Sequence, residues 1–244
     1  ITERGIGNGM SLLIFTSIAA GFPASLWAIQ QRSGWDVFIG IILMGFVVIS
    51  LVVFVEQSQR RIPVQYAKRM VGRRVYGGTS TYIPLKVNMA GVIPVIFASS
   101  LMSLPMLLAQ FNQRADGNNA GWVDWINANL VTGDKPMYMA LYIGLILFFT
   151  FFYVSITFNP TEVADNMKKY GGFIPGIRAG RPTAEYLSYV LTRITVPGAI
   201  YLALISLIPL IALVLVDANQ NFPFGGTSIL IIVGVGLETV KQIE

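Results

Sequence analysis

Seven basic side chains occur in the short segment from Glu56 to Lys86, whose only acid is Glu56; they are Arg60, Arg61, Lys68, Arg69, Arg73, Arg74 and Lys86. Uncharged segments of 19 and 25 residues flank it. This contrast places the basic segment on the cytoplasmic side of a membrane. A plain connector between antiparallel helices needs only a few residues. We therefore expect a partner outside the membrane to dock on this cationic segment.

A second basic group lies between residues 159 and 193. Arg178 and Arg181 fall on a segment, residues 173–182, that is punctuated by Pro175, Gly176, Gly180 and Pro182. Such a backbone is expected to turn and to stay exposed, with two guanidinium groups held away from the membrane. The group is either a binding site or part of the ordinary excess of positive charge on the cytoplasmic side.

Histidine and cysteine are both absent from the sequence. Imidazole catalysis, thiolate chemistry, disulfides and the usual zinc ligands are therefore excluded. We found no motif of a soluble enzyme. The sequence predicts neither an enzyme nor a bound metal or cofactor.

The composition is that of a polytopic membrane protein, with 54% apolar and 12% charged residues and a mean hydropathy of +0.64. About 20 residues cross a bilayer as a helix. Five uncharged stretches have about this length and a sixth is shorter: Met10–Ile29, Val37–Val55, Val87–Phe111, Tyr138–Phe158, Ile194–Val216 and Phe222–Leu237. We predict an all-α bundle of six transmembrane helices.

The basic residues also predict the orientation of these helices. With six crossings, 14 of the 17 Lys and Arg residues fall on one side, and only Arg32, Arg114 and Lys135 fall on the other. The excess of positive charge marks the cytoplasmic side, so both ends of the chain are expected there. The resulting regions are 1–55 (two helices), 56–86 (basic loop), 87–158 (two helices and an external segment), 159–193 (second loop) and 194–244 (two helices).

Local patterns predict the elements of the loops. Ile62, Val64 and Tyr66 alternate with other residues, and a second run passes through Val75 and Tyr76, which indicates a hairpin of two short exposed strands. In the external segment, the spacing of Trp122, Trp125, Ile126 and Leu130 is typical of an interfacial amphipathic helix. A plain capping helix is the favoured interpretation.

The second loop is expected to contain two helix starts. Asn159, Pro160 and Glu162 provide a cap, a proline in the first turn and an early acid. That helix should end at Gly171 and Gly172, and another should begin near Thr183 and continue into the fifth crossing.

The third crossing contains two prolines, Pro94 and Pro105, with the small residues Ala98, Ser99 and Ser100 between them. Proline interrupts the backbone hydrogen bonds, and small residues allow close approach. This helix is therefore expected to bend and slide against a neighbour, although kinks are also common in helices without that role.

The chain begins at Ile1 without an initiator methionine and stops at Glu244, soon after the short sixth stretch. We expect it to be part of a longer protein, with an upstream portion missing.

The residues resemble the SecY family, the channel subunit of the bacterial protein translocase, from end to end and in the same order. The matching segments are Ile1–Gly9, Tyr66–Arg69, Gly72–Tyr76, Pro84–Pro94, Phe158–Pro160, Asp165–Asn166, Lys168–Lys169, Pro175–Arg178 and Phe224–Ser228. The resemblance implies roughly the fifth to tenth helices of a ten-helix channel in the bacterial cytoplasmic membrane.

The resemblance also implies site residues and partners. Met10, Ile14, Ile96 and Ile231 would form part of an apolar pore ring, although isoleucine is usual at position 10. Pro94, Ser99, Ser100 and Pro105 would belong to a lateral gate through which signal sequences and membrane segments leave for lipid. Implied membrane partners are the small subunits SecE and SecG, the nascent polypeptide, the missing amino-terminal part of the channel and membrane lipids.

The two basic loops would meet partners in the cytoplasm. By resemblance, Lys68, Arg73 and Arg74 would contact the ribosome, with its RNA and exit-site proteins. The loop with Arg178, Arg181, Lys168 and Lys169 would contact the ribosome or the motor ATPase SecA. Lys and Arg bind phosphate-rich RNA through charge, whereas an arginine on a rigid tip is suited to a bidentate contact with a carboxylate or a phosphate.

Two other functions remain as alternatives. A secondary transporter should have charges or broken helices near the middle of the membrane. Here the broken helix is expected but the charges are missing, and only Glu238 comes close to an apolar stretch. A structural anchor that binds anionic lipid would need neither a proline-bent helix nor an arginine-bearing tip. The sequence thus favours a passive protein-conducting channel.

Overall fold

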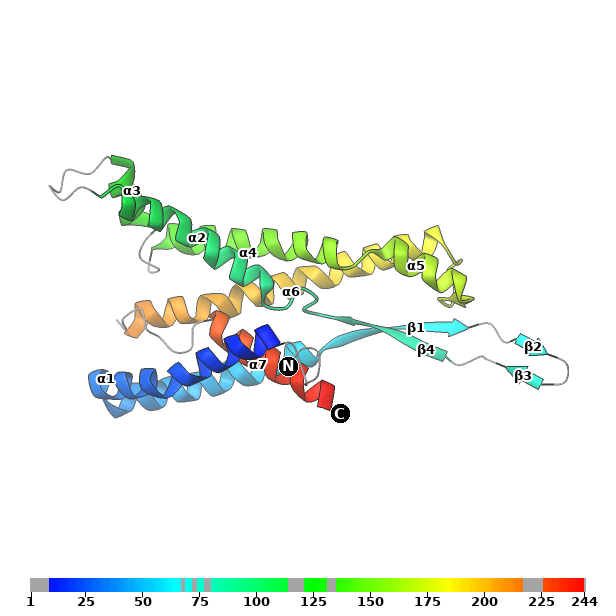
Figure 1. Cartoon of the computed structure of the whole chain (residues 1–244), viewed down its shortest axis with the longest axis horizontal. Helices are drawn as coiled ribbons and strands as arrows, with labels where there is room; N and C mark the ends of the chain where they lie inside the picture. The colour runs from blue at the N-terminus through cyan, green and yellow to red at the C-terminus, as the bar shows by residue number, and fades with distance from the viewer. Residues whose placement is uncertain are drawn as a thin grey trace. The chain divides into compact units, whose positions relative to one another are not determined.

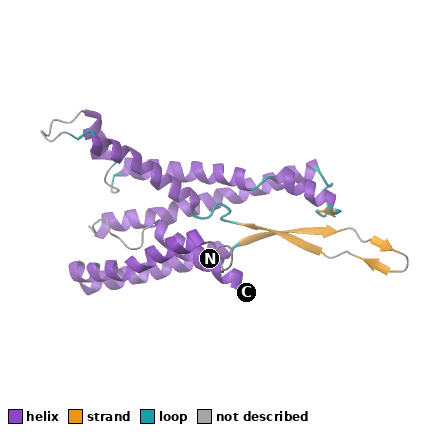
Figure 2. Cartoon of the chain, in the orientation of Figure 1, coloured by secondary structure: helices purple, strands orange, loops and turns teal. Residues whose placement is uncertain are grey.

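The computed structural model describes residues 9–66, 69–71, 74–76, 80–113, 121–130, 135–216 and 226–243. Figure 1 labels the helices and strands along the chain, and Figure 2 shows how far helices predominate. The chain divides into two compact units. Unit 1 comprises Ile1–Val55, Gly91–Phe149 and Ile200–Glu244, and unit 2 comprises Glu56–Ala90 and Thr150–Ala199.

Most of the expected membrane crossings are present as long apolar helices. Within the described residues, four helical segments are long and apolar enough to cross a membrane: Gly34–Gln57, Ile93–Phe111, Pro136–Lys169 and Arg181–Ile208. Two shorter apolar helical segments, Leu12–Ala28 and Ser228–Leu237, correspond to the first and sixth predicted crossings. The prediction of a multi-pass helical membrane protein is confirmed, with six as an approximate number of crossings.

The first helix, α1 (Gly9–Gln57), consists of two helices separated at Gly34. Gly34 has φ 82° and ψ 179°, a conformation that is essentially restricted to glycine. The helical hydrogen-bond pattern cannot continue through such a residue. The first two predicted crossings are therefore joined by a break at one glycine, and Figure 1 shows the chain reversing direction within α1.

The third crossing, α2 (Ile93–Phe111), begins later than the uncharged stretch from Val87 suggested. Pro94 lies in its first turn, where a missing N–H costs no intrahelical hydrogen bond. The prediction that Pro94 interrupts this helix is therefore wrong, because Pro94 helps to start it. Pro105 is inside the helix and does remove a backbone donor.

The external segment contains the short helix α3 (Gly121–Asn129), which confirms the predicted helix. The structure shows which of its side chains face the core of unit 1, and the interfacial role of the tryptophans stays a prediction. Val123 is fully buried and Ile126 packs against the core of unit 1, whereas Trp122 and Trp125 are exposed. Trp122 lies roughly 100° and Trp125 roughly 160° around the helix from the fully buried Val123.

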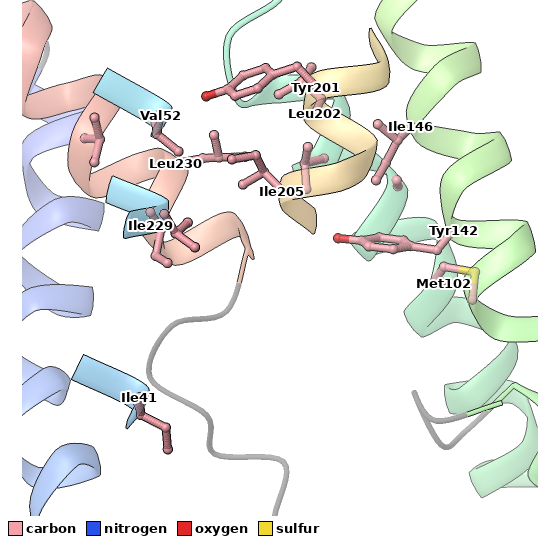
Figure 3. Packing of buried hydrophobic residues seen from close by; sticks show 14 of the residues in the cluster. Ile41, Val52, Met102, Tyr142, Ile146, Tyr201, Leu202, Ile205, Ile229 and Leu230 are labelled. Atoms are coloured by element: carbon pink, nitrogen blue, oxygen red, sulfur yellow. The ribbon is translucent and has the colours of Figure 1, made fainter. Parts of the chain in front are cut away.

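The core of unit 1 is built around α6 (Arg181–Val216). Figure 3 shows Leu202 and Ile205 of α6 lying between two groups of apolar side chains. One group comes from α7 (Gly226–Ile243) and α1, and the other from α4 (Pro136–Thr157) and α2. Phe97 of α2 also stacks on Phe149 of α4, with ring centroids 5.7 Å apart. Helices far apart in the sequence thus share one apolar core.

Unit 2 contains a three-stranded antiparallel sheet in the order β4-β1-β5. Strand β1 (Gln59–Tyr66) pairs with β4 (Ser80–Lys86) along seven residues, from Gln59 opposite Lys86 to Gln65 opposite Ser80. The predicted hairpin is therefore present, but with a different second strand. Val75 belongs to β3 (Arg74–Tyr76), which pairs with β2 (Arg69–Val71) in a separate two-stranded sheet.

The two ends of the hairpin are fixed to each other by hydrogen bonds. The Val87 backbone N–H donates to the Ser58 carbonyl at 3.1 Å, and the Asn88 side-chain amide donates to Glu56 Oε1 at 2.6 Å. Asn88 is buried, so this bond compensates for the loss of water around its amide. A side chain at Gly198 of α6 would collide with the Val87 carbonyl oxygen. Glycine at this position lets α6 approach the hairpin.

Helix α5 (Pro160–Lys169) begins as predicted, with Asn159 as its cap. The Asn159 side-chain oxygen accepts hydrogen bonds from the backbone N–H groups of Thr161 at 3.1 Å and Glu162 at 3.4 Å. The chain then forms β5 (Gly172–Phe173) and enters α6 at Arg181, close to the predicted start near Thr183. Asn capping and the Pro-Gly-rich turn explain these boundaries.

Candidate functional site

The basic hairpin has one buried apolar face, so it is less exposed than the sequence suggested. Ile62 and Val64 of β1 and Leu85 of β4 are almost completely buried in the core of unit 2. This core also contains Met167 of α5 and Leu187 of α6. Because strand side chains alternate between two faces, burial of this apolar set determines which residues remain outside.

The exposed positions of the hairpin carry cations. Arg60, Arg61 and Lys86 are exposed, and the Arg61 guanidinium lies 4.7 Å from the centre of the Tyr82 ring. A cation over an aromatic face is held by the ring quadrupole while it remains accessible. Of the three predicted ribosome-binding residues, Lys68 and Arg73 lie outside the described residues, and Arg74 belongs to β3.

The second basic loop is held by turns and by one side-chain hydrogen bond. The Ile177 backbone N–H donates to the Ile174 carbonyl at 3.0 Å, and Ile174 is buried in the core of unit 2. The Thr183 hydroxyl, also buried, donates to the Arg178 carbonyl at 2.8 Å. The backbone of Arg178 is thus fixed on both sides while its side chain is exposed.

Arg178 and Arg181 differ in their surroundings, which the sequence did not reveal. The Arg181 side chain donates to Glu185 Oε1 at 3.1 Å, one helical turn away on α6. Both groups are largely exposed, so the pair contributes little to stability, but the carboxylate compensates the charge of Arg181. Within the described residues, no ion pair is found for Arg178. Arg178 is therefore the better candidate for contact with a partner.

Lys168 and Lys169 occupy the last turn of α5, and both are exposed. Cations are favoured at a helix C-terminus by the helix dipole, so this position has a structural explanation of its own. It also places two positive charges just before β5 and the Arg178 loop. The same compact unit thus contains the hairpin and the four basic residues Lys168, Lys169, Arg178 and Arg181.

The four predicted pore residues lie on three helices of unit 1. Met10 and Ile14 belong to α1, Ile96 to α2 and Ile231 to α7. Ile14 and Ile96 are 41% and 38% exposed, whereas Ile231 is buried. Ile229 and Leu230, which precede Ile231 on α7, belong to the core of unit 1. The ring itself stays a prediction.

Two serine hydroxyls of α2, the predicted gate helix, form hydrogen bonds within the helix. The hydroxyls of Ser99 and Ser100 both donate to the Ile96 carbonyl, at 2.9 and 2.8 Å. A serine that bonds back to its own helix hides its polar group and favours a slight bend. Pro105 lies about one and a half turns further on, so α2 combines two causes of bending within its membrane-crossing length.

These elements define a multi-pass membrane protein that combines apolar helices with a basic β-hairpin and a basic helix–loop segment. The chain belongs to the SecY family, whose model matches residues 1–240. It is 70% identical over 248 residues to the protein translocase subunit SecY of Streptomyces galbus and 60% identical to that of Mycobacterium tuberculosis. All of this chain is matched in both cases, but it covers only 56% of each relative's length.

Solved structures agree on the fold. A structure described as "The structure of a protein conducting channel" matches with a TM-score of 0.64 and 22% identity, covering 99% of this chain and 60% of that chain. A second structure, on the plug domain of the SecY protein, matches to the same extent. At this identity the likeness concerns the fold alone.

Proposed function

We propose that this chain forms part of a passive protein-conducting channel that exports preproteins across the bacterial cytoplasmic membrane and inserts membrane proteins into it. The observation that carries the proposal is 70% identity along the whole chain to a relative named as a translocase subunit. The channel is not an enzyme, and SecA or the translating ribosome supplies the driving force. Both ends of the chain lie in the cytoplasm, as the distribution of Lys and Arg indicates.

The chemistry of the helices supports a pore for polypeptide rather than for ions. None of the six apolar stretches contains Asp, Glu, Lys, Arg or His, and Glu238 directly follows the sixth. A neutral constriction attracts side chains of neither sign, and a narrow apolar ring resists ions by losing its water. Ile14 and Ile96, with their partly exposed side chains, contribute to this ring together with Met10 and Ile231. Methionine at position 10 remains apolar and is more deformable than isoleucine.

Helix α2 serves as one side of the lateral gate. Its serines hydrogen-bond within the helix and Pro105 removes one backbone bond, so bending costs less here than in a regular helix. Motion of α2 would open the channel sideways to lipid. Signal sequences and apolar segments of nascent membrane proteins would leave by this route.

The cytoplasmic hairpin and the Arg178 loop dock the ribosome and SecA. Exposed Arg and Lys side chains suit the phosphates of ribosomal RNA, and the fixed backbone of Arg178 suits a bidentate contact with a phosphate or a carboxylate. The small subunits SecE and SecG complete the assembly in the membrane.

Crosslinking to a preprotein stalled during export tests the proposed pore. A photoreactive amino acid would be placed at position 10, 14, 96 or 231 of the complete channel, and at Leu101 as the control. Leu101 lies on α2 with 40% exposure, similar to Ile96, but on another side of the helix. We expect adducts with the preprotein at the four ring positions and adducts with lipid at Leu101. Equal yields at Ile96 and Leu101 would refute the assignment of Ile96.

A further inference from the structure

Strand β1 has a partner on each of its edges. Strand β4 pairs with one edge and completes the hairpin, while β5 pairs with the other edge through Gln65 opposite Phe173 and Tyr66 opposite Gly172. Strand β5 immediately precedes the turn that carries Arg178. The second basic loop is therefore attached to the sheet of the first, although about a hundred residues separate them in the sequence.

The attachment at β5 depends on a close backbone approach. Gly172 is buried, and a Cβ at this position would lie 3.0 Å from Cε1 of the Tyr66 ring and 3.4 Å from the Met167 carbonyl oxygen. Any side chain at position 172 must push the ring of Tyr66 aside or move β5 away from β1. Glycine here thus allows the loop to lie against the hairpin.

A second attachment holds the other side of the loop. The Thr183 hydroxyl is buried and donates to the Arg178 carbonyl, which ties Arg178 to the first turn of α6. Leu187, one turn further along α6, is buried in the same core as Ile62 and Val64 of the hairpin. The same apolar core therefore supports the hairpin and the segment that holds Arg178.

We propose that Gly172 and Thr183 are positioning residues that hold Arg178 at a fixed distance and direction from the hairpin, so that the two basic loops form one rigid docking surface. The hairpin contributes Arg60, Arg61 and Lys86, and the attached segment contributes Lys168, Lys169 and Arg178. The chemistry of this surface fits a polyanion of fixed shape, such as the folded RNA of a ribosome.

Rigidity matters because both loops contact one partner. A surface that is already in its binding geometry loses little conformational freedom on association. If Arg178 moved independently of the hairpin, its segment would lose conformational freedom each time a ribosome bound, and this loss would weaken binding. The functional part of this inference rests on the proposed docking of ribosomes, whereas its geometric part concerns unit 2 alone.

The geometric part is tested by distance measurements in the complete translocase. The chain contains no cysteine, so cysteines at Thr81 on β4 and Ala179 beside Arg178, both exposed, can carry a pair of spin labels. We expect Gly172→Val and Thr183→Val each to widen the distribution of label distances. Thr183→Ser, which keeps the hydroxyl, should retain the parent distribution. The control Thr192→Val removes an exposed hydroxyl that bonds to Ser188 on the same helix, and it should change nothing.

Ribosome affinity supplies the functional measurement. Thr183→Val should lower the affinity about threefold to tenfold, the range expected for loss of one hydrogen bond. Unchanged distance distributions in both Gly172→Val and Thr183→Val would overturn the inference. It would also be overturned if the distributions widened and Arg178→Glu weakened binding, but Thr183→Val left affinity unchanged. If Arg178→Glu itself had no effect on binding, the proposed docking role would be wrong, and the label distances would still decide the geometry.

Discussion

Single apolar residues decide whether the proposed constriction stays dry. Replacing Ile96 or Ile231 with Asn introduces an amide that favours water where the ring should exclude it. The closed state should then lose about 1 to 2 kcal/mol relative to the open state, which raises the open fraction roughly fivefold to thirtyfold. We expect export of precursors with defective signal sequences and a higher resting ion conductance in the complete channel.

Expression level separates this gain of function from simple damage to packing. Leu202→Asn, in the fully buried core of unit 1, is the matched control and should lower the amount of folded protein without relaxing selection of signal sequences. If the Asn variants at positions 96 and 231 behave like Leu202→Asn, these isoleucines are packing residues and do not line a pore.

At the scale of elements, the hairpin combines a buried apolar face with a basic end. Reversal of Lys68, Arg73 and Arg74 to Glu leaves Ile62, Val64 and Leu85 in place, so the hairpin should still fold against α5 and α6. Ribosome binding should weaken and depend less steeply on salt. Each lost phosphate contact should remove about 0.7 to 0.9 from the slope of log affinity against log salt.

The matched control for this change is reversal of the three basic residues that are predicted to lie on the external side. Changing Arg32, Arg114 and Lys135 to Glu alters the net charge by the same amount but touches neither basic loop. Ribosome affinity should be unaffected by this control. An unchanged affinity and slope in the hairpin variant would show that the docking element lies elsewhere.

The orientation of the chain is a property of the whole molecule, and the absence of cysteine makes it simple to test. Single cysteines at Thr81 and Ala179 should react with a membrane-impermeant maleimide only from the cytoplasmic side. Cysteines at Gln113 and Ala128, which are also exposed, should react only from outside. Labelling in intact cells and in inverted vesicles provides both comparisons. External labelling of Thr81 would contradict the predicted orientation.

Features that depend on neighbours in the sequence were predictable. Uncharged stretches of membrane-crossing length identified the main helices, since every charged side chain is costly to bury in lipid whatever its distant neighbours are. The capping by Asn159 and the continuous helix from the second loop into the fifth crossing followed from local chemistry as well. In each case the deciding residues lie within a few positions of one another.

Other local patterns left two solutions open, and packing chose between them. In α3, Trp122 and Val123 both lie beside Ile126 on the helix surface, and the structure buries Val123 and exposes both tryptophans. Pro94 was read as an interruption because the uncharged stretch began at Val87, but the helix begins only at Ile93. An apolar stretch shows that a segment can enter the membrane, but it does not determine at which residue the helical hydrogen bonds begin.

The sequence by itself determined that this is a membrane-spanning helical protein with two basic loops, because transfer to lipid, charge asymmetry and helix capping act through local composition. Its membership of the SecY family followed from the match of its residues to that family along the chain. Only the tertiary structure decided that the loops share a sheet. The pairing of Tyr66 with Gly172 joins residues more than a hundred positions apart, and it depends on the absence of a side chain at the point of contact. A glycine that the sequence marks as a helix end is, in three dimensions, the place where Arg178's loop meets the hairpin.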